Sequence, residues 1–269
     1  MTIVLALAAG LVALAAAIRS TWSPCGLSML ATITPLAEQG RGNRYRTTAG
    51  WFVAGSVLGG ATLGLAIALL AAGAAATHPS SSVLASVAAA AAVAALAADA
   101  RVGSFHLPIH HRQVNERWLD QFRPWVYGVG FGWQIGAGVA TYIKTSAVYL
   151  MIVLAALTGS PTTAVVIGAV FGLVRGLTVF LGAHITSARA LADFHRRFTA
   201  ADPVALAIVV ASEGAVALTL STLVSPWLGA GAAAIFGLTA LLARAVRRRQ
   251  RNTASNAPTA AARRHVTIP

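Results

Sequence analysis

The chain has 269 residues, of which 57% are hydrophobic and only 10% are charged. Globular domains carry about 45–50% apolar and about 25% charged residues, so this composition excludes a soluble globular domain. The apolar residues gather in uninterrupted runs, each long enough for a helix to cross a hydrocarbon core about 30 Å thick. The sequence therefore predicts an all-α, polytopic helical membrane protein that is embedded in a lipid bilayer.

The formal net charge of +13 does not indicate a nucleic-acid partner, because the basic residues punctuate apolar runs instead of covering one exposed face. The single cysteine excludes an internal disulfide and a multi-cysteine metal site. The N-terminal apolar run lacks a basic n-region, so we expect it to belong to the mature protein and not to a cleaved signal peptide. No cofactor is expected, because the sequence contains no nucleotide-binding loop or catalytic triad.

Hydropathy predicts seven membrane spans, at residues 3–38, 47–73, 82–98, 125–157, 163–187, 203–224 and 227–243. The first and fourth are too long for one straight crossing, since the 36 residues of the first would extend about 54 Å as a helix. We expect helix breaks at Ser23-Pro24 in the first span and at the glycine-rich segment 128–132 in the fourth.

The arginines predict the orientation, because cytoplasmic loops collect Lys and Arg. Of the 20 basic residues, 17 fall in four segments, at 41–46, 101–123, 189–197 and 244–264. Seven crossings of the cell membrane, with the N-terminus outside and the C-terminus in the cytoplasm, place all four segments inside. Residues 99–124 then form a cytoplasmic loop, and residues 244–269 form a disordered basic cytoplasmic tail that touches anionic lipid.

The two halves of the chain resemble each other. Residues 21–26 lie 111 positions before residues 132–137, and the Gly-x-x-x-Gly pattern at 55–59 lies 113 positions before that at 168–172. Since each half holds three spans, residues 1–98 and 125–224 would form two inverted three-helix repeats, followed by a seventh helix at 225–243. Inverted repeats with a broken leading helix are a carrier design whose site lies near the midplane. The alternative is a chance match between Ala/Gly-rich helices.

Four charged residues lie inside predicted spans, where each costs about 2.5–3.5 kcal/mol and marks a functional site by default. We expect Arg175 and Glu213 to form a structural ion pair between the fifth and sixth spans. Arg19 and Lys144 are then left without a carboxylate on the two broken helices, where freed helix N-termini would add positive charge and favour an anion. The alternative is that helix-end carbonyls and water satisfy both cations.

The expected substrate-binding residues are these two cations and residues at the breaks: Arg19, Lys144, Pro24, Gln134 and Gly136. Cys25 is a candidate redox thiol, because a half-helix N-terminus and Arg19 would favour its reactive thiolate. The alternative is an inert, buried apolar side chain. The loop histidines, His106, His110 and His111, predict a solvated loop and not a metal site, because neither cysteine nor a convincing set of carboxylates accompanies them.

The segment Trp22-Ser23-Pro24-Cys25 at a broken first helix, residues 130–133 at the start of the fourth span, and two three-helix halves resemble the CcdA/DsbD transmembrane family. The resemblance implies a carrier of electrons from cytoplasmic thioredoxin to extracytoplasmic thiols, including those of cytochrome c maturation. That family has a redox cysteine beside proline in each half, whereas the second half here has neither at 134–136. In addition, Ser28 stands where the family tends to have proline.

Three functions follow. The leading hypothesis is a carrier for a small anionic or thiol-containing solute, which the intramembrane cations favour. The second is a thiol-disulfide conduit of the cytochrome c biogenesis type, in which Cys25 works with the cysteine of a thioredoxin-like partner; only in this case is the protein an enzyme, a thiol-disulfide oxidoreductase. The third is a non-transporting membrane scaffold or assembly factor, for which no residue pattern speaks directly.

Overall fold

The computed structural model describes residues 1–101, 121–139, 141–231, 233, 234 and 237, and this part of the chain is helical without strands. The elements, in chain order, are α1 (Thr2–Ser20), α2 (Pro24–Thr32), α3 (Pro35–Gly40), α4 (Tyr45–Ala76), α5 (Ser81–Asp99), α7 (Pro124–Gly136), α8 (Ala147–Leu157), α9 (Pro161–Leu177), the 3-10 helix η1 (Thr178–Gly182), α10 (Ala188–Ala200) and α11 (Asp202–Val224).

Five helical segments are long and apolar enough to cross a membrane: Thr2–Ser20, Tyr45–Ala76, Ser81–Asp99, Pro161–Gly182 and Ala188–Val224. The shorter α8 is also apolar. These helices confirm the predicted all-α, polytopic membrane protein. The segment 102–120 with its histidines, residues 232, 235, 236 and 238–243 of the predicted seventh helix, and the tail at 244–269 lie outside the described residues. The orientation of the termini and the inverted repeat stay predictions.

The first predicted break is confirmed at Ser23-Pro24. Helix α1 ends at Ser20 and α2 begins at Pro24, where proline lacks the N–H that a helix start leaves unpaired. The Ser23 hydroxyl accepts a hydrogen bond of 3.2 Å from the Gly26 N–H and so caps α2. The first long apolar run, 3–38, is therefore divided into α1, α2 and the start of α3, with a short turn between α1 and α2.

The second predicted break is wrong in position. The segment 128–132 is helical within α7, and the chain leaves the helix only after Gly136, through a non-helical connection at 137–146 that leads to α8. The glycines of α7 serve packing instead: a Cβ on Gly132 would collide with the Phe52 backbone of α4. The turn is made by Gly138, whose φ of +67° favours glycine.

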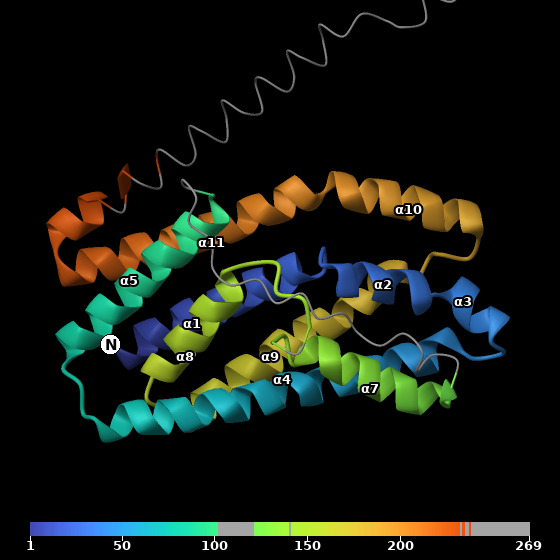
Figure 1. Cartoon of the computed structure of the whole chain (residues 1–269), viewed down its shortest axis with the longest axis horizontal. Helices are drawn as coiled ribbons and strands as arrows, with labels where there is room; N and C mark the ends of the chain where they lie inside the picture. The colour runs from blue at the N-terminus through green and yellow to red at the C-terminus, as the bar shows by residue number, and fades with distance from the viewer. Residues whose placement is uncertain (102–120, 140, 232, 235–236, 238–269) are drawn as a thin grey trace, which may run out of the picture.

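The helices pack in a small number of close pairs. Figure 1 shows α4 along the bottom of the view, α10 and α11 along the top, and α1, α2 and α3 between them. Helix α4 packs against α9 and α7, α5 packs against α11, and α1 packs against α8. The backbones of α4 and α9 touch where Gly60 faces Gly168 and Gly172, as expected for small residues at a helix crossing in a membrane.

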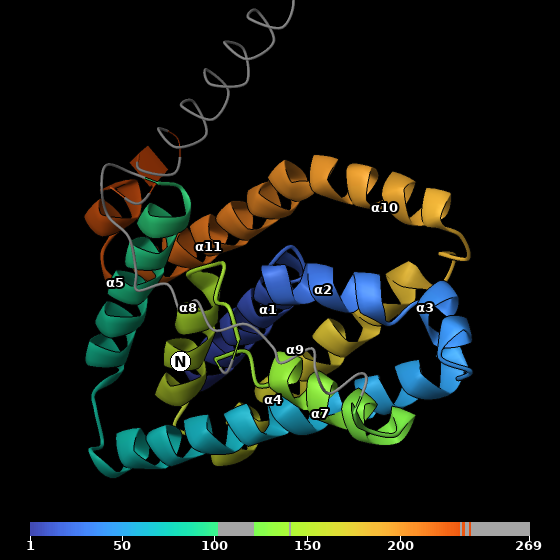
Figure 2. The same ribbon diagram turned by 45° about the vertical axis from the view of Figure 1, so that its right-hand side comes forward.

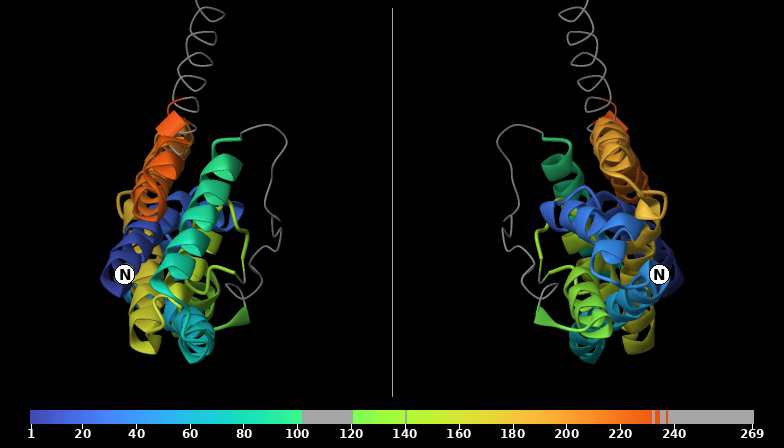
Figure 3. Two further views of the ribbon diagram at one scale, coloured as in Figure 1. Left: turned by 90° about the vertical axis from the view of Figure 1, so that its left-hand side faces the viewer. Right: turned by 90° about the vertical axis from the view of Figure 1, so that its right-hand side faces the viewer.

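The buried apolar side chains form two clusters. The larger one joins α1, α4, α5, α8, α9 and α11 and is rich in alanine, which lets these helices approach closely. The smaller one gathers Cys25, Phe52, Tyr127 and Phe131 from α2, α4 and α7. In the turned view of Figure 2 and the end-on views of Figure 3, α4 and α10–α11 lie on opposite sides of the bundle.

Candidate functional site: the charged junction between the two breaks

The two breaks are joined by charged side chains. Arg19 lies in the last turn of α1, Lys144 lies in the connection before α8, and Asp202 is the first residue of α11. The Arg19 Nη1 atom lies 2.5 Å from Asp202 Oδ1, and Lys144 Nζ lies 2.8 Å from the same oxygen. We call Arg19, Lys144 and Asp202, together with Trp22 and Phe198, the charged junction.

The expectation that Arg19 and Lys144 lack a carboxylate is therefore wrong. Asp202 lies one residue before the predicted span 203–224, so the sequence assigned it to a loop, but the start of α11 brings it to both cations. Two cations share one carboxylate, so the junction keeps one net positive charge. The Arg19 side chain is only 6% exposed, whereas Lys144 and Asp202 are 27% and 34% exposed, which leaves these two accessible.

Trp22, which lies in the first break, binds Phe198 of α10. Lys144 Nζ donates a 2.8 Å hydrogen bond to the Trp22 carbonyl, which satisfies a backbone acceptor left free just after the end of α1. The Trp22 indole Nε1 donates to the Phe198 carbonyl at 2.7 Å, and the two rings stack with centroids 4.3 Å apart. The end of α10, and with it the start of α11, is therefore docked onto the break.

The start of α8 already holds a carboxylate. Asp99, at the end of α5, accepts a 2.9 Å hydrogen bond from the Ser146 N–H and a second one from the Thr145 hydroxyl. Asp99 thus caps the helix start and neutralises its partial positive charge. Of the two helix starts at the breaks, this one is occupied by the protein's own anion, contrary to the expectation that both would add positive charge.

The predicted ion pair between Arg175 and Glu213 is wrong. Arg175 Nη1 donates instead to the Ile135 carbonyl at 2.5 Å, and its guanidinium lies over the Phe171 ring, 5.6 Å from the centroid. The Ile135 carbonyl lies in the last turn of α7, where the partial negative charge of the helix end attracts the cation. Glu213 is fully buried, and neither of its carboxylate oxygens has a hydrogen-bond partner among the residues that the structure describes.

The remaining predicted site residues lie at the breaks but serve packing and capping. Pro24 and Cys25 open α2, where the Cys25 side chain is 2% exposed and lies within electrostatic range of Arg175. Gln134 donates to the carbonyl of its own helix four residues earlier, at 3.3 Å. Gly136 packs against the backbone of α4. Of the predicted site residues, the structure thus brings Arg19 and Lys144 to one shared carboxylate, that of Asp202.

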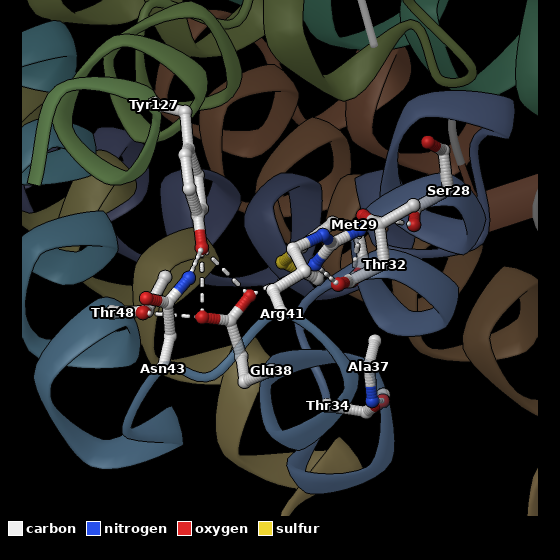
Figure 4. A network of polar contacts seen from close by, with 10 residues as sticks. All are labelled: Ser28, Met29, Thr32, Thr34, Ala37, Glu38, Arg41, Asn43, Thr48 and Tyr127. Atoms are coloured by element: carbon white, nitrogen blue, oxygen red, sulfur yellow. Dashed lines mark hydrogen bonds and ion pairs between the residues drawn. The ribbon is translucent and has the colours of Figure 1, made fainter. Parts of the chain in front are cut away.

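The structure contains a second polar cluster that the sequence did not predict (Figure 4). Glu38 of α3 is fully buried and accepts hydrogen bonds from the Tyr127 hydroxyl at 2.7 and 2.9 Å, from the Thr48 hydroxyl at 2.6 Å and from Arg41 at 3.0 Å. Asn43 donates to the Tyr127 hydroxyl at 3.2 Å. We call these five residues the Glu38 cluster. The available signal was a single glutamate at the end of the first span, directly before an arginine-rich loop.

Among the described residues, no group of three or more His, Cys, Asp or Glu side chains is placed to hold a metal ion. The chemistry that the charged junction offers is therefore the recognition of charge. Arginine and lysine together present several N–H donors to one carboxylate, an arrangement that suits other small oxyanions equally well.

The chain is similar to proteins named methylamine utilization protein MauF. It is 32% identical over 182 residues to that of Paracoccus denitrificans, covering 65% of this chain and 63% of the relative. It is 30% identical over 181 residues to that of Paracoccus versutus (65% and 64%), and 31% identical over 175 residues to that of Methylobacillus flagellatus (62% and 59%). No family model matches the chain, and no solved structure matches it. The chain is thus a membrane protein with several apolar helices that is similar to MauF over less than two thirds of the relatives' length.

Proposed function

We propose that the chain is a membrane carrier for a small anionic solute, and that Asp202 occupies the place of the solute's anionic group. The observation that carries this proposal is the single carboxylate that bridges Arg19 and Lys144, at 2.5 and 2.8 Å. The junction keeps one net positive charge, so a monovalent anion that binds beside or in place of Asp202 gains a partner with little reorganisation.

The helix arrangement supports a carrier. The two cations come from the breaks of α1–α2 and α7–α8. The pairs α4–α9 and α5–α11 join corresponding spans of the two predicted repeats, and the pair α1–α8 joins their two leading spans. Inverted-repeat carriers bind their substrates between broken helices in this way. The name of the similar proteins, methylamine utilization protein, supports a role for the proposed transport step in the use of methylamine.

Displacement of Asp202 provides a way to couple binding to movement. Asp202 is the first residue of α11, and the end of α10 is docked by Trp22 onto the first break. A solute anion that takes both cations from Asp202 leaves that carboxylate to water, which its 34% exposed side chain can reach. The start of α11 then loses its two ion pairs with Arg19 and Lys144 and is free to move.

Binding of small anions to the purified full chain in lipid nanodiscs tests the proposal. The probes are formate, acetate, oxalate and sulfate, with glutathione as the thiol-containing candidate, measured by thermal shift against chloride of equal ionic strength. We expect at least one probe to stabilise the protein, and the Lys144→Met and Arg19→Met variants to lose that effect. Asp202→Asn removes the internal competitor and should tighten binding of the same probe.

The matched control for the cation variants is Arg196→Met. Arg196 is 78% exposed and pairs with Asp193 on its own helix, two residues before Phe198, so the change removes one positive charge near the junction without removing either cation that binds Asp202. Probe binding should be unchanged in this variant. A stabilising probe whose effect survives in both Lys144→Met and Arg19→Met contradicts the carrier site.

A thiol-disulfide conduit is the second candidate, supported by the place of Cys25 within electrostatic range of Arg175 and by the resemblance to the CcdA/DsbD family. In such a conduit the Cys25 thiolate attacks a partner's disulfide, forms a mixed disulfide and releases one partner thiolate. Trapping tests it, using a thioredoxin that lacks its resolving cysteine and carries thionitrobenzoate disulfide-bonded to its remaining cysteine, so that attack by Cys25 releases thionitrobenzoate as the leaving thiolate; Cys25→Ser is the control. Efficient capture that depends on Cys25 favours the conduit, and its absence leaves the carrier.

The proposed orientation places residues 99–124 and 188–202 in the cytoplasm and residues 78–79 and 159–160 outside. Single cysteines introduced at positions 101 and 159 on a Cys25→Ala background, labelled with an impermeant reagent in whole cells, test this orientation. We expect labelling at 159 only. Labelling at 101 and not at 159 would invert the assignment.

A further inference from the structure

Glu213 is a charged residue that neither the ion pairs nor the hydrogen bonds of the described structure use. It lies at the midpoint of α11, eleven residues from Asp202 and eleven from Val224, or about 16 Å from either helix end. Its side chain is fully buried, and neither carboxylate oxygen has a hydrogen-bond partner. The residue thus lies deep in the membrane without any of the contacts that usually accompany a buried charge.

Among the described residues, no cation forms an ion pair with Glu213. Helix α11 packs against α5, α1 and α10. From α5, the negative charge of Asp99 acts on Glu213 and repels it, and from α1, Arg19 is bound to Asp202. The charged and titratable groups of α10 precede the start of α11: Arg189, Asp193, His195, Arg196 and Arg197. The rest of the contact surface is apolar and includes small alanines of α1 and α5.

An ionised carboxylate at such a position costs several kcal/mol, whereas the neutral acid, which carries no charge, costs far less. The described conformation therefore suits a Glu213 that carries a proton. A conformation in which α11 exposes this side chain to water would suit the ionised form. The group can thus bind a proton in one conformation and release it in another.

We propose that Glu213 is the proton-binding site of the carrier, so that one proton crosses the membrane with each anion. The inference rests on the proposed carrier function and deepens it. The step is a proton transfer only: one carboxylate oxygen accepts a proton from water and later returns it to water, and no other bond changes. Asp202 and Glu213 lie on the same helix, so a movement that frees Asp202 from its two cations also moves Glu213. A monovalent anion and a proton then cross together without net charge.

The first test measures the proton itself and does not depend on transport. Infrared spectra of the full chain in vesicles of phosphatidylcholine and phosphatidylglycerol at neutral pH report the carbonyl stretch of protonated carboxylic acids. We expect a band in the wild-type protein that is absent in Glu213→Gln and present in Asp193→Asn, the control at an exposed carboxylate. A spectrum that is unchanged by Glu213→Gln would overturn the proton site, whatever the fate of the anion site.

The second test measures coupling in the same vesicles with the anion that gives the largest thermal shift. A pH gradient should drive uptake by the wild type, and Glu213→Gln should slow this driven uptake about tenfold or more while anion exchange without a gradient continues. Gradient-driven uptake at the wild-type rate would contradict the inference. A Glu213→Gln protein that fails to fold would also contradict the inference. If Glu213 is protonated, glutamine replaces a neutral acid of nearly the same shape and should be tolerated. If Lys144→Met loses both anion exchange and gradient-driven uptake, this result concerns the anion site and not the proton site.

Discussion

Glu38 and Glu213 are both glutamates with fully buried side chains, yet their surroundings are opposite. The carboxylate of Glu38 accepts hydrogen bonds from Tyr127, Thr48 and Arg41, and it holds α3, α4 and α7 together. The carboxylate of Glu213 has no hydrogen-bond partner. The difference teaches that burial alone does not assign a role. A carboxylate in a complete network stabilises the fold, whereas a carboxylate without partners contributes no more to fold stability than a neutral side chain of the same shape would.

Removing Glu38 should have the largest effect on stability. Glu38→Ala leaves Arg41 without its carboxylate and the hydroxyls of Tyr127 and Thr48 without their acceptor. We expect a loss of about 3–5 kcal/mol in the free energy of unfolding, the magnitude for one partner of a buried pair. Equilibrium unfolding in mixed detergent micelles measures it. A loss below about 1 kcal/mol would remove the contrast between the two glutamates.

Asp202 should rank second, because the charged junction is a network like that of Glu38 but is partly exposed. Asp202→Asn leaves two cations without a carboxylate, and the exposure of Lys144 and Asp202 reduces the cost to about 2 kcal/mol. Combining Asp202→Asn with Lys144→Met should recover part of this loss, since only one uncompensated cation then remains. A double variant that is less stable than Asp202→Asn alone would show that Lys144 stabilises the junction through Trp22.

Tyr127→Phe sharpens the comparison by removing the hydroxyl that donates to Glu38 and accepts from the Asn43 amide. The remaining bonds from Thr48 and Arg41 keep Glu38 paired, so we expect a loss of about 1 kcal/mol in the free energy of unfolding. Asn43→Ala, which removes only the outer amide, is the control and should cost less than about 0.5 kcal/mol. An equal loss in both variants would show that the bond to Glu38 is not what Tyr127 contributes.

Glu213→Gln should have the smallest effect, between no change and a slight gain in stability. Because Arg175 binds the Ile135 carbonyl and not Glu213, the variants Arg175→Met and Glu213→Gln should combine additively, with a coupling energy below about 0.5 kcal/mol. A double-mutant cycle by thermal unfolding measures the coupling. A coupling energy above about 1 kcal/mol would show that Arg175 and Glu213 interact, as the sequence suggested.

Most of the fold could be predicted because the apolar runs and the Ser-Pro helix starts are local signals. The break at Ser23-Pro24 is one such case. The second break was misplaced because glycine has two uses that a sequence does not separate: Gly132 brings α7 against α4, whereas Gly138 makes the turn. The predicted pairing of charged residues was wrong for a related reason. Hydropathy gives the depth of a residue but not the side of the helix that it faces, so Arg175 and Glu213 were matched by depth.

Asp202 and Glu38 were missed because each lies at the edge of an apolar run, where a charge is expected to meet water. Their true partners come from elsewhere: Arg19 lies 183 residues before Asp202, and Tyr127 lies 89 residues after Glu38. Such contacts follow from the packing of α11 and α7, which no local pattern contains. The terminal position of both residues in their helices was the one available hint, since carboxylates favour helix starts.

The length of α4 has a consequence for the membrane around the protein. Its 32 residues extend about 48 Å, well beyond a hydrocarbon core about 30 Å thick. The helix must therefore tilt or thicken the bilayer beside it, and each solution carries an elastic cost that depends on lipid chain length. Since α7 and α9 pack along α4, its tilt sets theirs. Lipid chain length thus affects the orientation of α7, the helix that leads into the second break.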